Sequence, residues 1–537
     1  MKLEPVKWDE STAWNRYAGF LDMSMSTFQD VQDHLLMEQV RTLKSSPLGM
    51  RAFQFEAPRT PEEFRQKVRI TTYADYLEAL DPTDPKYLPD ADYAWAHTTG
   101  AQARFKHVPY TKAAYERMLD NVFGAFLIAS AHQKGQVNVR PGDRIMFNVP
   151  PRPYLSGLVA FGMRDRFGFH GIIEPEEAEH MEFKSKIREN FARAMRERVD
   201  LIVSMTSVLL RAGESFELGR KGGAKSEKMD LNWRAKARYL KAKAKSLLFR
   251  RPPRAGDVWN SRGIIGWGVD TGIFKEQVER YWGRRPMELY ACTEGGVMGA
   301  QPWDSDGIAP NPYMNYLEFM TLEDAEKLRA DRNYMPKLLR LADVEPGREY
   351  ELIITSFNGM PFIRYRLGHR VRFLDRSRSG DRDVPHFEFL GRGDDRIDIA
   401  GFTRVDEKTL WEAVRTSKIP VAEWTARSES VGGRPILHFY AEATGPVAED
   451  VAEQLHETLL ELDPFYKDLE QMLGIRPVKV TLLPNGTWDR YYDVMRLSGA
   501  ELADRVPPRI NASDNNIERL IALSTEKPER LEQAVPA

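Results

Sequence analysis

The sequence has little cysteine, little net charge and no long hydrophobic run. Its 537 residues include one cysteine, Cys292, so no intrachain disulfide can form and a reducing compartment is expected. The formal net charge of −2 gives no overall attraction to nucleic acid and disfavours a strongly basic nucleic-acid-binding protein. No apolar run approaches the roughly 18 residues that span a bilayer, and the first residues, MKLEPVKWDE, lack the apolar core of a signal peptide. These absences predict a soluble, cytoplasmic protein with no nucleic-acid partner and no membrane span.

The motifs of several large enzyme classes are missing as well. The chain has no Walker loop, no HExxH or CxxC metal set and no G-x-S-x-G elbow. The sequence signatures of P-loop NTPases, zinc proteases and α/β-hydrolases are therefore absent.

Length and periodicity predict two domains. From residue 91 to about 210, the apolar runs DRIMFNV, SGLVAFGM, GIIEP and DLIVSM alternate with helical segments, including a long amphipathic helix near 178–198. The alternation resumes after residue 253 with RGIIGWGVD, a helix at 272–282 and the strand MELY. This pattern predicts an α/β domain of mostly parallel sheets covered by helices, which we assign to residues 1–390. Beyond it, helices at 406–416 and 447–462 and the strands ILHFYAEA and VKVTLLP predict a smaller α+β lid domain at 391–537.

A basic segment at about 219–254 interrupts the first domain. Its cations greatly outnumber its acids, and its apolar support includes Trp233, Leu240, Leu247 and Leu248. A solvated insertion without a specific ligand is the simpler interpretation. A basic helix of this kind could also dock an acidic carrier protein, a phosphorylated cofactor or a membrane surface.

The stretch Pro361–Gly401 contains two apolar runs, PFIRYRLGHRVRFL and HFEFLGRGDDRIDIAG. Each run carries a cluster of arginine and glycine, and the second cluster adds two aspartates. A sheet commonly presents such loops to a ligand. The cluster GRGDD also marks the joint between the two predicted domains.

Two further loops carry groups suited to phosphate chemistry. The loop HTTGAQAR contains hydroxyls, a glycine and a cation, which can surround phosphate oxygens. The loop YACTEGG follows the strand MELY, and its hydroxyl and carboxylate could hold a substrate hydroxyl or a Mg²⁺ ion bound to phosphates. Either loop alone is more often an ordinary turn.

Together, HTTGAQAR, YACTEG, YRLGH and GRGDD resemble the motifs of the adenylate-forming (ANL) superfamily, in the order that the superfamily has them. Within it, FRQKVRITTYADYLEAL and GMPFIRYR resemble phenylacetate–coenzyme A ligases. PNPYMNYLEF and the ending VTLLPNGTWDRYYDVMRLSGAELADRVPPR resemble the acyl acid–amido synthetases that join auxin or jasmonate to amino acids. The resemblance extends over about residues 60–510, and the ending is its more discriminating part.

The resemblance implies roles for particular residues. Those expected to bind the nucleotide are Thr98, Thr99, Gly100, Arg104, Tyr290, Thr293, Glu294, His369 and Arg392. Thr293 and Glu294 would meet the α-phosphate, Glu294 would also hold Mg²⁺, and Arg392 would reach the ribose or a phosphate. Asp394 would be the hinge at which the lid rotates. Arg392, Asp394 and Glu294 are the expected catalytic set.

Two departures from the superfamily pattern affect the expected chemistry. His369 stands where the family has an aspartate that accepts both ribose hydroxyls, and a neutral imidazole accepts only one hydrogen bond. No Gly-Lys pair occurs near the carboxyl terminus, where most coenzyme A ligases keep an acyl-activating lysine.

The resemblance implies an ATP-dependent ligase that forms an acyl-adenylate from a carboxylic acid. Because the ending resembles the amido synthetases and the acyl-activating lysine is missing, an amine or amino acid is favoured as the acceptor over coenzyme A. Two alternatives remain: an acyl-CoA ligase that forms a thioester, and a catalytically altered homologue that binds a nucleotide or a partner protein.

Overall fold

The computed structural model forms two compact units, Met1–Phe389 (unit 1) and Leu390–Ala537 (unit 2). It describes residues 1–90, 92–99, 105–217, 233–267, 271–380, 382–392, 396–399, 403–431, 434–463, 466–467, 476–500 and 505–525. The boundary between the units falls inside a strand, β13 (Phe387–Arg392). In the described part of the chain, no helix is both long enough and apolar enough to cross a membrane.

Unit 1 is built around a seven-stranded sheet with the order β4-β3-β5-β6-β7-β8-β9. Its strands are β3 (Arg144–Asn148), β4 (His170–Gly171), β5 (Leu201–Met205), β6 (Gly263–Trp267), β7 (Met287–Cys292), β8 (Gly296–Ala300) and β9 (Ala309–Pro310). The pairings from β4 through β7 are parallel, whereas β8 and β9 pair antiparallel. The predicted α/β architecture is therefore confirmed, with an antiparallel edge added to the parallel sheet.

The helices of this part of unit 1 pack on the sheet or, as α10 does, on other helices. They are α5 (Lys112–Ser130), α6 (Leu155–Phe167), α7 (Pro175–Glu179), α8 (Phe183–Arg196), α9 (Thr206–Glu217), α10 (Trp233–Leu248), α11 (Ala255–Val258) and α12 (Thr271–Trp282). The apolar run SGLVAFGM lies in α6 rather than in a strand. Its Gly162 packs so closely on α5 that a Cβ atom there would lie 2.5 Å from Leu119. Periodicity alone does not distinguish a short buried strand from a buried helix.

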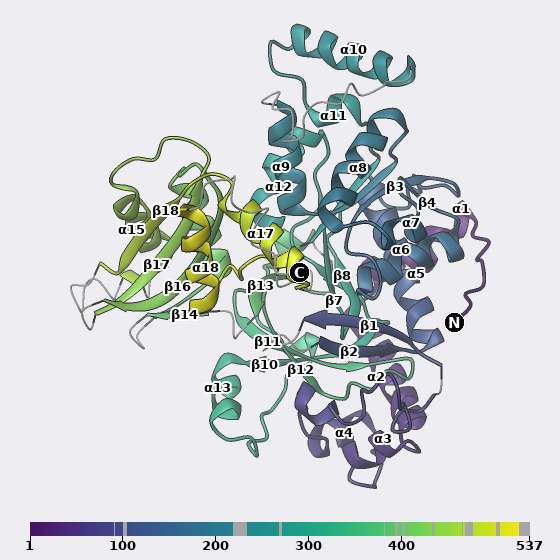
Figure 1. The fold of residues 1–537 in the computed structure, drawn as a ribbon. Helices are drawn as coiled ribbons and strands as arrows, with labels where there is room; N and C mark the ends of the chain where they lie inside the picture. The colour runs from purple at the N-terminus through teal and green to yellow at the C-terminus, as the bar shows by residue number, and fades with distance from the viewer. Residues whose placement is uncertain are drawn as a thin grey trace. The chain divides into compact units, whose positions relative to one another are not determined.

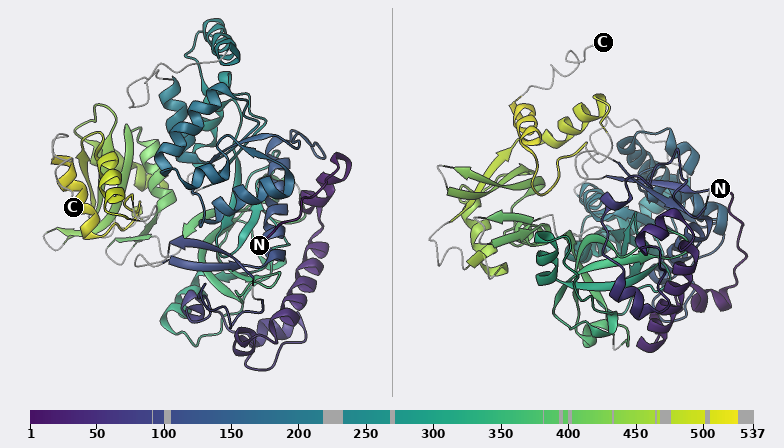
Figure 2. Two further views of the ribbon diagram at one scale, coloured as in Figure 1. Left: turned by 45° about the vertical axis from the view of Figure 1, so that its right-hand side comes forward. Right: turned by 90° about the horizontal axis from the view of Figure 1, so that it is seen from below.

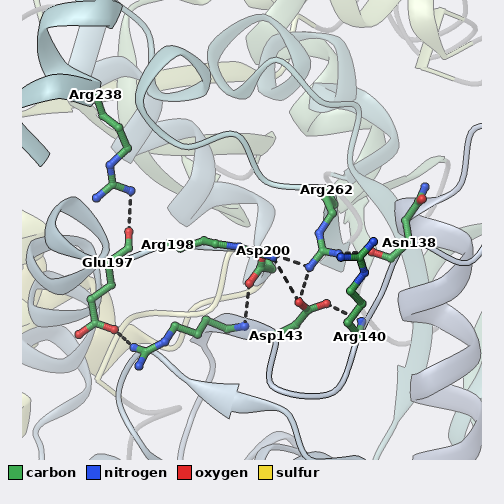
Figure 3. A network of polar contacts seen from close by, with 9 residues as sticks. Asn138, Arg140, Asp143, Glu197, Arg198, Asp200, Arg238 and Arg262 are labelled. Carbon is green, nitrogen blue, oxygen red and sulfur yellow. Dashed lines mark hydrogen bonds and ion pairs between the residues drawn. The ribbon is translucent and has the colours of Figure 1, made fainter. Parts of the chain in front are cut away.

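Charged side chains tie together the ends at which the parallel strands begin (Figure 3). Asp143 precedes β3, Asp200 precedes β5, and Arg262 precedes β6. Arg262 Nη2 lies 3.0 Å from Asp200 Oδ1 and also pairs with Asp143. The two aspartates are nearly buried, so the arginine supplies the counter-charge that their burial requires.

A second sheet of unit 1 has the order β10-β11-β12-β13 and is antiparallel from β10 to β12. Besides β13 it contains β10 (Asn315–Thr321), β11 (Glu349–Ser356) and β12 (Tyr365–Phe373), with α13 (Leu322–Ala330) following β10. A separate antiparallel hairpin consists of β1 (Ala94–Thr99) and β2 (Phe105–Tyr110).

The N-terminal helices are α1 (Glu10–Tyr17), α2 (Met25–Leu43), α3 (Pro47–Ala52) and α4 (Pro61–Lys67). Helix α2 runs beside β10 at the edge of unit 1, where Figures 1 and 2 show it in purple. Its Gln32 side chain donates to the carbonyls of Pro312 and Asn315, both at 2.7 Å. This amide thus supplies donors to two backbone carbonyls at and just before the start of β10.

Unit 2 has its own hydrophobic core, which includes Trp424, Leu437 and Phe439. Its strands are β14 (Arg396–Ile399), β15 (Thr403–Asp406), β16 (Val421–Val431), β17 (Arg434–Ala443) and β18 (Val478–Leu483). Its helices are α14 (Glu407–Thr416), α15 (Val451–Leu462), α17 (Thr487–Leu497) and α18 (Asp514–Thr525). The helices predicted at 406–416 and 447–462 are confirmed as α14 and α15.

Candidate active site

The turn that joins β7 to β8 carries Thr293 and Glu294, and its backbone is held from three neighbouring segments. The Tyr110 hydroxyl of β2 donates to the Thr293 carbonyl at 2.6 Å. The Asn315 amide of β10 donates to the Gly295 carbonyl at 2.7 Å, and the Ser356 hydroxyl of β11 donates to the Glu294 carbonyl at 3.4 Å. The turn is therefore a fixed support for the Glu294 side chain rather than a loose connection.

The Glu294 carboxylate is buried, with only 2% of the residue exposed. Its Oε1 lies 3.1 Å from Lys106 Nζ and 3.3 Å from the Tyr365 hydroxyl, and Lys106 Nζ lies 3.4 Å from the same hydroxyl. Burial, and then the charge of Glu294, raise the pKa of Tyr365, so its phenol keeps its proton and donates it. A buried carboxylate with a cation and a hydroxyl at one oxygen is a strong local charge centre.

Tyr290 and His369 form a second contact of the same region. The Tyr290 hydroxyl lies 2.8 Å from His369 Nδ1, and the two residues are 4% and 5% exposed. The ring of Phe389 lies 5.3 Å from the Tyr290 ring and 5.0 Å from the His369 ring. His369 is thus held by a hydrogen bond and by aromatic packing, which fixes the direction of its imidazole.

The predicted phosphate loop is only partly described. Thr98 and Thr99 are the last residues of β1, and the structure describes their backbone but not their side chains. Gly100 and Arg104 lie outside the described residues. No role of this loop can be read from its geometry, so it stays a prediction.

Sequence reasoning missed Lys106. The sequence predicts Arg104 as the cation of the loop, which stays a prediction, and the strand pairing places a second cation, Lys106, opposite Thr98 at the start of the returning strand. From there its ammonium group reaches Glu294, 188 residues later in the chain. The available signal was the position of Lys106 in FKHVPY, directly after the glycine-containing loop.

Of the two residues predicted at the joint, the structure describes Arg392 but not Asp394. Arg392 is the last residue of β13 and is exposed, and Asp394 lies outside the described residues. Within the described ranges, no group of three or more His, Cys, Asp or Glu side chains is arranged to hold a metal ion.

Arg364, which belongs to the first arginine cluster of Pro361–Gly401, does not point toward a ligand. This residue is 1% exposed, and its guanidinium makes two hydrogen bonds to the Glu318 carboxylate, at 3.0 and 2.9 Å. Its third nitrogen donates to the carbonyls of Arg65 and Val68, at the end of α4. Arg364 therefore joins β10 to the N-terminal helices, which corrects the expectation that this cluster as a whole faces a ligand.

Comparison with known proteins gives a family for part of the chain. Residues 308–392 match the GH3 family central domain. The chain is 26% identical over 268 residues to the indole-3-acetic acid-amido synthetase GH3.3 of Arabidopsis thaliana, a match that covers 45% of this chain and 42% of that protein. It is 25% identical over 282 residues to the jasmonoyl–L-amino acid synthetase GH3.5 of Oryza sativa subsp. japonica, covering 48% and 47%. The chain thus spans less than half the length of these relatives.

Solved structures extend the likeness to nearly the whole chain. The acyl acid amido synthetase GH3.15 of Arabidopsis thaliana superposes with a TM-score of 0.69 at 17% identity, covering 97% of both chains. A 2-hydroxyisobutyryl-CoA ligase in the postadenylation state superposes with a TM-score of 0.60 at 16% identity, covering 97% and 98%. At these identities the likeness concerns the fold, and it confirms the predicted fold class. Residues 308–392 thus match the GH3 family central domain, and the chain as a whole has the fold seen in an acyl acid amido synthetase and in a CoA ligase of known structure.

Proposed function

We propose that the protein is an ATP-dependent ligase that activates a carboxylic acid as its acyl-adenylate and passes the acyl group to an amine or amino acid. The observation that carries the proposal is the buried Glu294 with Lys106 and Tyr365, on a supported turn at the end of β7. The carboxyl ends of parallel strands are where α/β enzymes bind their ligands. The relatives of known activity bear the names of amido synthetases.

In the first half-reaction, the substrate carboxylate attacks the α-phosphorus of ATP. A new P–O bond forms, the bond to the β-phosphate bridging oxygen breaks, and pyrophosphate leaves. Negative charge spreads over the phosphate oxygens as this happens, and Lys106 supplies positive charge beside Glu294. Thr98, Thr99, Gly100 and Arg104 are proposed to bind the phosphates, Thr293 the α-phosphate, and Tyr290 with His369 the nucleoside.

Glu294 fits a Mg²⁺ site of the kind that uses one carboxylate, water and substrate phosphates, since Mg²⁺ is seldom bound by an all-protein cage. When bound, the ion would neutralise phosphate charge and orient the nucleotide. The single buried carboxylate is consistent with this and with the lack of a larger ligand cluster among the described residues.

In the second half-reaction, the amine nitrogen attacks the acyl carbonyl and the C–N bond forms; AMP leaves with the electrons of the C–O bond, and the nitrogen gives up one proton to water. We propose that unit 2 is the lid and that Asp394 is the hinge on which it turns between the two steps, with Arg392 reaching the ribose or a phosphate. A few residues at an element's end can absorb such a rotation.

Acid-dependent release of pyrophosphate tests the first step. The full-length protein, with ATP, MgCl₂ and a panel of carboxylic acids, should release pyrophosphate only when an acid is present, and hydroxylamine should trap the adenylate as a hydroxamate. No release with any acid of a broad panel would reject catalysis and favour a nucleotide-binding or partner-binding homologue.

The acceptor is tested in the same preparation. Amino acids and coenzyme A are offered separately, and amide and thioester are measured by mass spectrometry. We expect amide. Thioester without amide would reverse the assignment to an acyl-CoA ligase, an alternative favoured by the superposition on 2-hydroxyisobutyryl-CoA ligase.

His369→Asp is expected to strengthen ATP binding by about tenfold. A carboxylate accepts hydrogen bonds from both ribose hydroxyls, whereas a neutral imidazole accepts one, and a hydrogen bond to a charged acceptor contributes roughly 1.5 kcal/mol. Calorimetric titration with ATP and Mg²⁺ measures the change. His369→Asn is the matched control, because it has the shape of aspartate without its charge. Weaker binding by both variants would mean that the contact between His369 and Tyr290 is itself needed for the nucleotide.

A further inference from the structure

Helix α10 presents a row of apolar side chains to solvent. Trp233, Leu240 and Leu247 are 73%, 65% and 80% exposed and are spaced by seven residues, so they line one stripe of the helix. Leu248 and Phe249 continue the apolar surface at its C-terminal end and are also exposed. Figure 1 shows α10 at the periphery of unit 1, on the outer side of α11. We call Trp233, Leu240 and Leu247 the outer stripe.

The opposite face of α10 is anchored, which sets the direction of the outer stripe. Ala235 and Ala242 are fully buried, and the helix packs on α11 and α8. Arg238 donates to the carbonyls of Met195 at 2.8 Å and Glu197 at 2.6 Å, and Figure 3 shows its guanidinium on Glu197. These carbonyls belong to the C-terminal end of α8, where the helix dipole favours a cation. The helix cannot turn the outer stripe inward without breaking these bonds.

Positive charge surrounds the outer stripe. From Trp233 to Arg254 the chain has no aspartate or glutamate, and its cations are Arg234, Lys236, Arg238, Lys241, Lys243, Lys245, Arg250, Arg251 and Arg254. On a helix of 3.6 residues per turn, Lys236 and Lys243 flank the outer stripe on one side and Lys241 on the other. All three lysines are exposed. Arg251 and Lys245 are partly neutralised by Asp257, at 2.7 and 3.8 Å, and Arg254 by Glu217, at 3.5 Å, but the other six cations of the segment keep it positive.

We propose that α10 lies in the plane of an anionic phospholipid surface, with the outer stripe in the acyl-chain boundary and the flanking lysines among the headgroups. Trp and Leu on one face with lysines beside them is the composition of an interfacial helix, and lysine stems can extend along apolar surface toward the headgroups. Such a helix lies on the membrane, in keeping with the lack of a spanning helix in the described part of the chain.

Lipid is favoured over an acidic protein by the size and shape of the surface. A helix of 16 residues is about 24 Å long and about 10 Å wide, so one face offers roughly 240 Å². A stable protein interface needs about 800 Å² from each partner. A bilayer has no such requirement, because it deforms around each side chain and contributes a continuous negative surface.

Vesicle flotation with the full chain tests the proposal. The protein should float with vesicles of phosphatidylcholine and 30% phosphatidylserine at low salt, and not with pure phosphatidylcholine. Brominated acyl chains should quench part of the protein's tryptophan fluorescence. This quenching should disappear in Trp233→Phe, because Trp233 is the residue in contact with the acyl chains. No flotation with the anionic vesicles would overturn the proposal, and binding to an acidic carrier protein in their place would assign α10 to a protein partner.

Matched variants locate the binding. Lys236→Gln, Lys241→Gln and Lys243→Gln combined should lower the partition coefficient about 100-fold, since each lysine near an anionic surface contributes roughly fivefold. The double variant Leu240→Ser, Leu247→Ser should lower the partition coefficient at least tenfold. This corresponds to about the transfer free energy lost when two partly buried leucine side chains are removed. Replacing the exposed Lys2, Lys44 and Lys337 by glutamine removes equal charge elsewhere and should leave binding nearly unchanged. Equal flotation by the α10 and control variants would reject the assignment. Circular dichroism and pyrophosphate release check that each variant is folded.

Discussion

Glu294→Gln is expected to lower acid-dependent pyrophosphate release by about 100- to 1,000-fold, the usual effect of removing one preorganised electrostatic group at a reacting phosphate or acyl centre. Glutamine keeps the size of the side chain and its place beside Lys106 and Tyr365, but it removes the negative charge of a residue that is 2% exposed. The rate is measured with a coupled pyrophosphate assay at saturating ATP and at several Mg²⁺ concentrations. If Glu294 holds Mg²⁺, the Mg²⁺ concentration needed for half-maximal rate should rise.

A double-mutant cycle with Lys106→Met separates this role from the ion pair. Lys106→Met alone leaves the buried carboxylate without its cation and should also lower the rate. If Glu294 served only to balance Lys106, the double variant would recover activity and stability together. We expect stability to recover in part and the rate to stay low. A double variant as active as the unchanged protein would show that neither residue takes part in the reaction.

Arg364→Met is expected to reduce the free energy of unfolding of unit 1 by about 3–5 kcal/mol, which makes it the largest expected effect on stability. The side chains of Arg364 and Glu318 are 2% and 1% exposed, and breaking a buried pair leaves an uncompensated charge in the interior. The substitution also removes the hydrogen-bond donor of the Arg65 and Val68 carbonyls, which accept from the same guanidinium. Urea unfolding followed by tryptophan fluorescence measures the change in midpoint.

Two comparisons make this result specific. Arg364→Met with Glu318→Leu removes both charges and should recover part of the loss, but not all, because the two carbonyls still lack their donor. Arg348→Met breaks a pair with Glu345 whose side chains are 60% and 63% exposed, and it should cost less than about 1 kcal/mol. Equal effects of Arg364→Met and Arg348→Met would contradict the buried role of Arg364.

The order of elements could be predicted from the sequence because periodicity is a local property. The runs DRIMFNV and DLIVSM lie in β3 and β5, and the helices expected at 272–282 and 406–416 are α12 and α14. The run SGLVAFGM could not be assigned in this way, because its burial on both sides hides the helical period and because Gly162 fits α6 against α5. The resemblance to the adenylate-forming superfamily likewise rests on short local motifs, and residues 308–392 match the GH3 family central domain.

Residue roles within the motifs depended on contacts far apart in the chain. Arg364 and His369 stand five positions apart in one apolar run, yet Arg364 pairs with Glu318 and His369 contacts Tyr290. The direction of each side chain follows from strand pairing and from the residues that pack beside it. Residues adjacent in the sequence determine neither of these. The roles proposed for Thr98, Thr99, Gly100, Arg104, Arg392 and Asp394 stay predictions.

The sequence by itself determined the alternation of strands and helices, the order of the four motifs and the basic composition of residues 219–254, since each depends on residues close together in the chain. Tertiary structure alone decided that Lys106 is the cation beside Glu294, that Arg364 is a buried support, and that Arg238 turns the outer stripe of α10 to solvent. Each of these joins residues separated by tens to hundreds of positions, and only the folded chain brings their charges within a few ångströms.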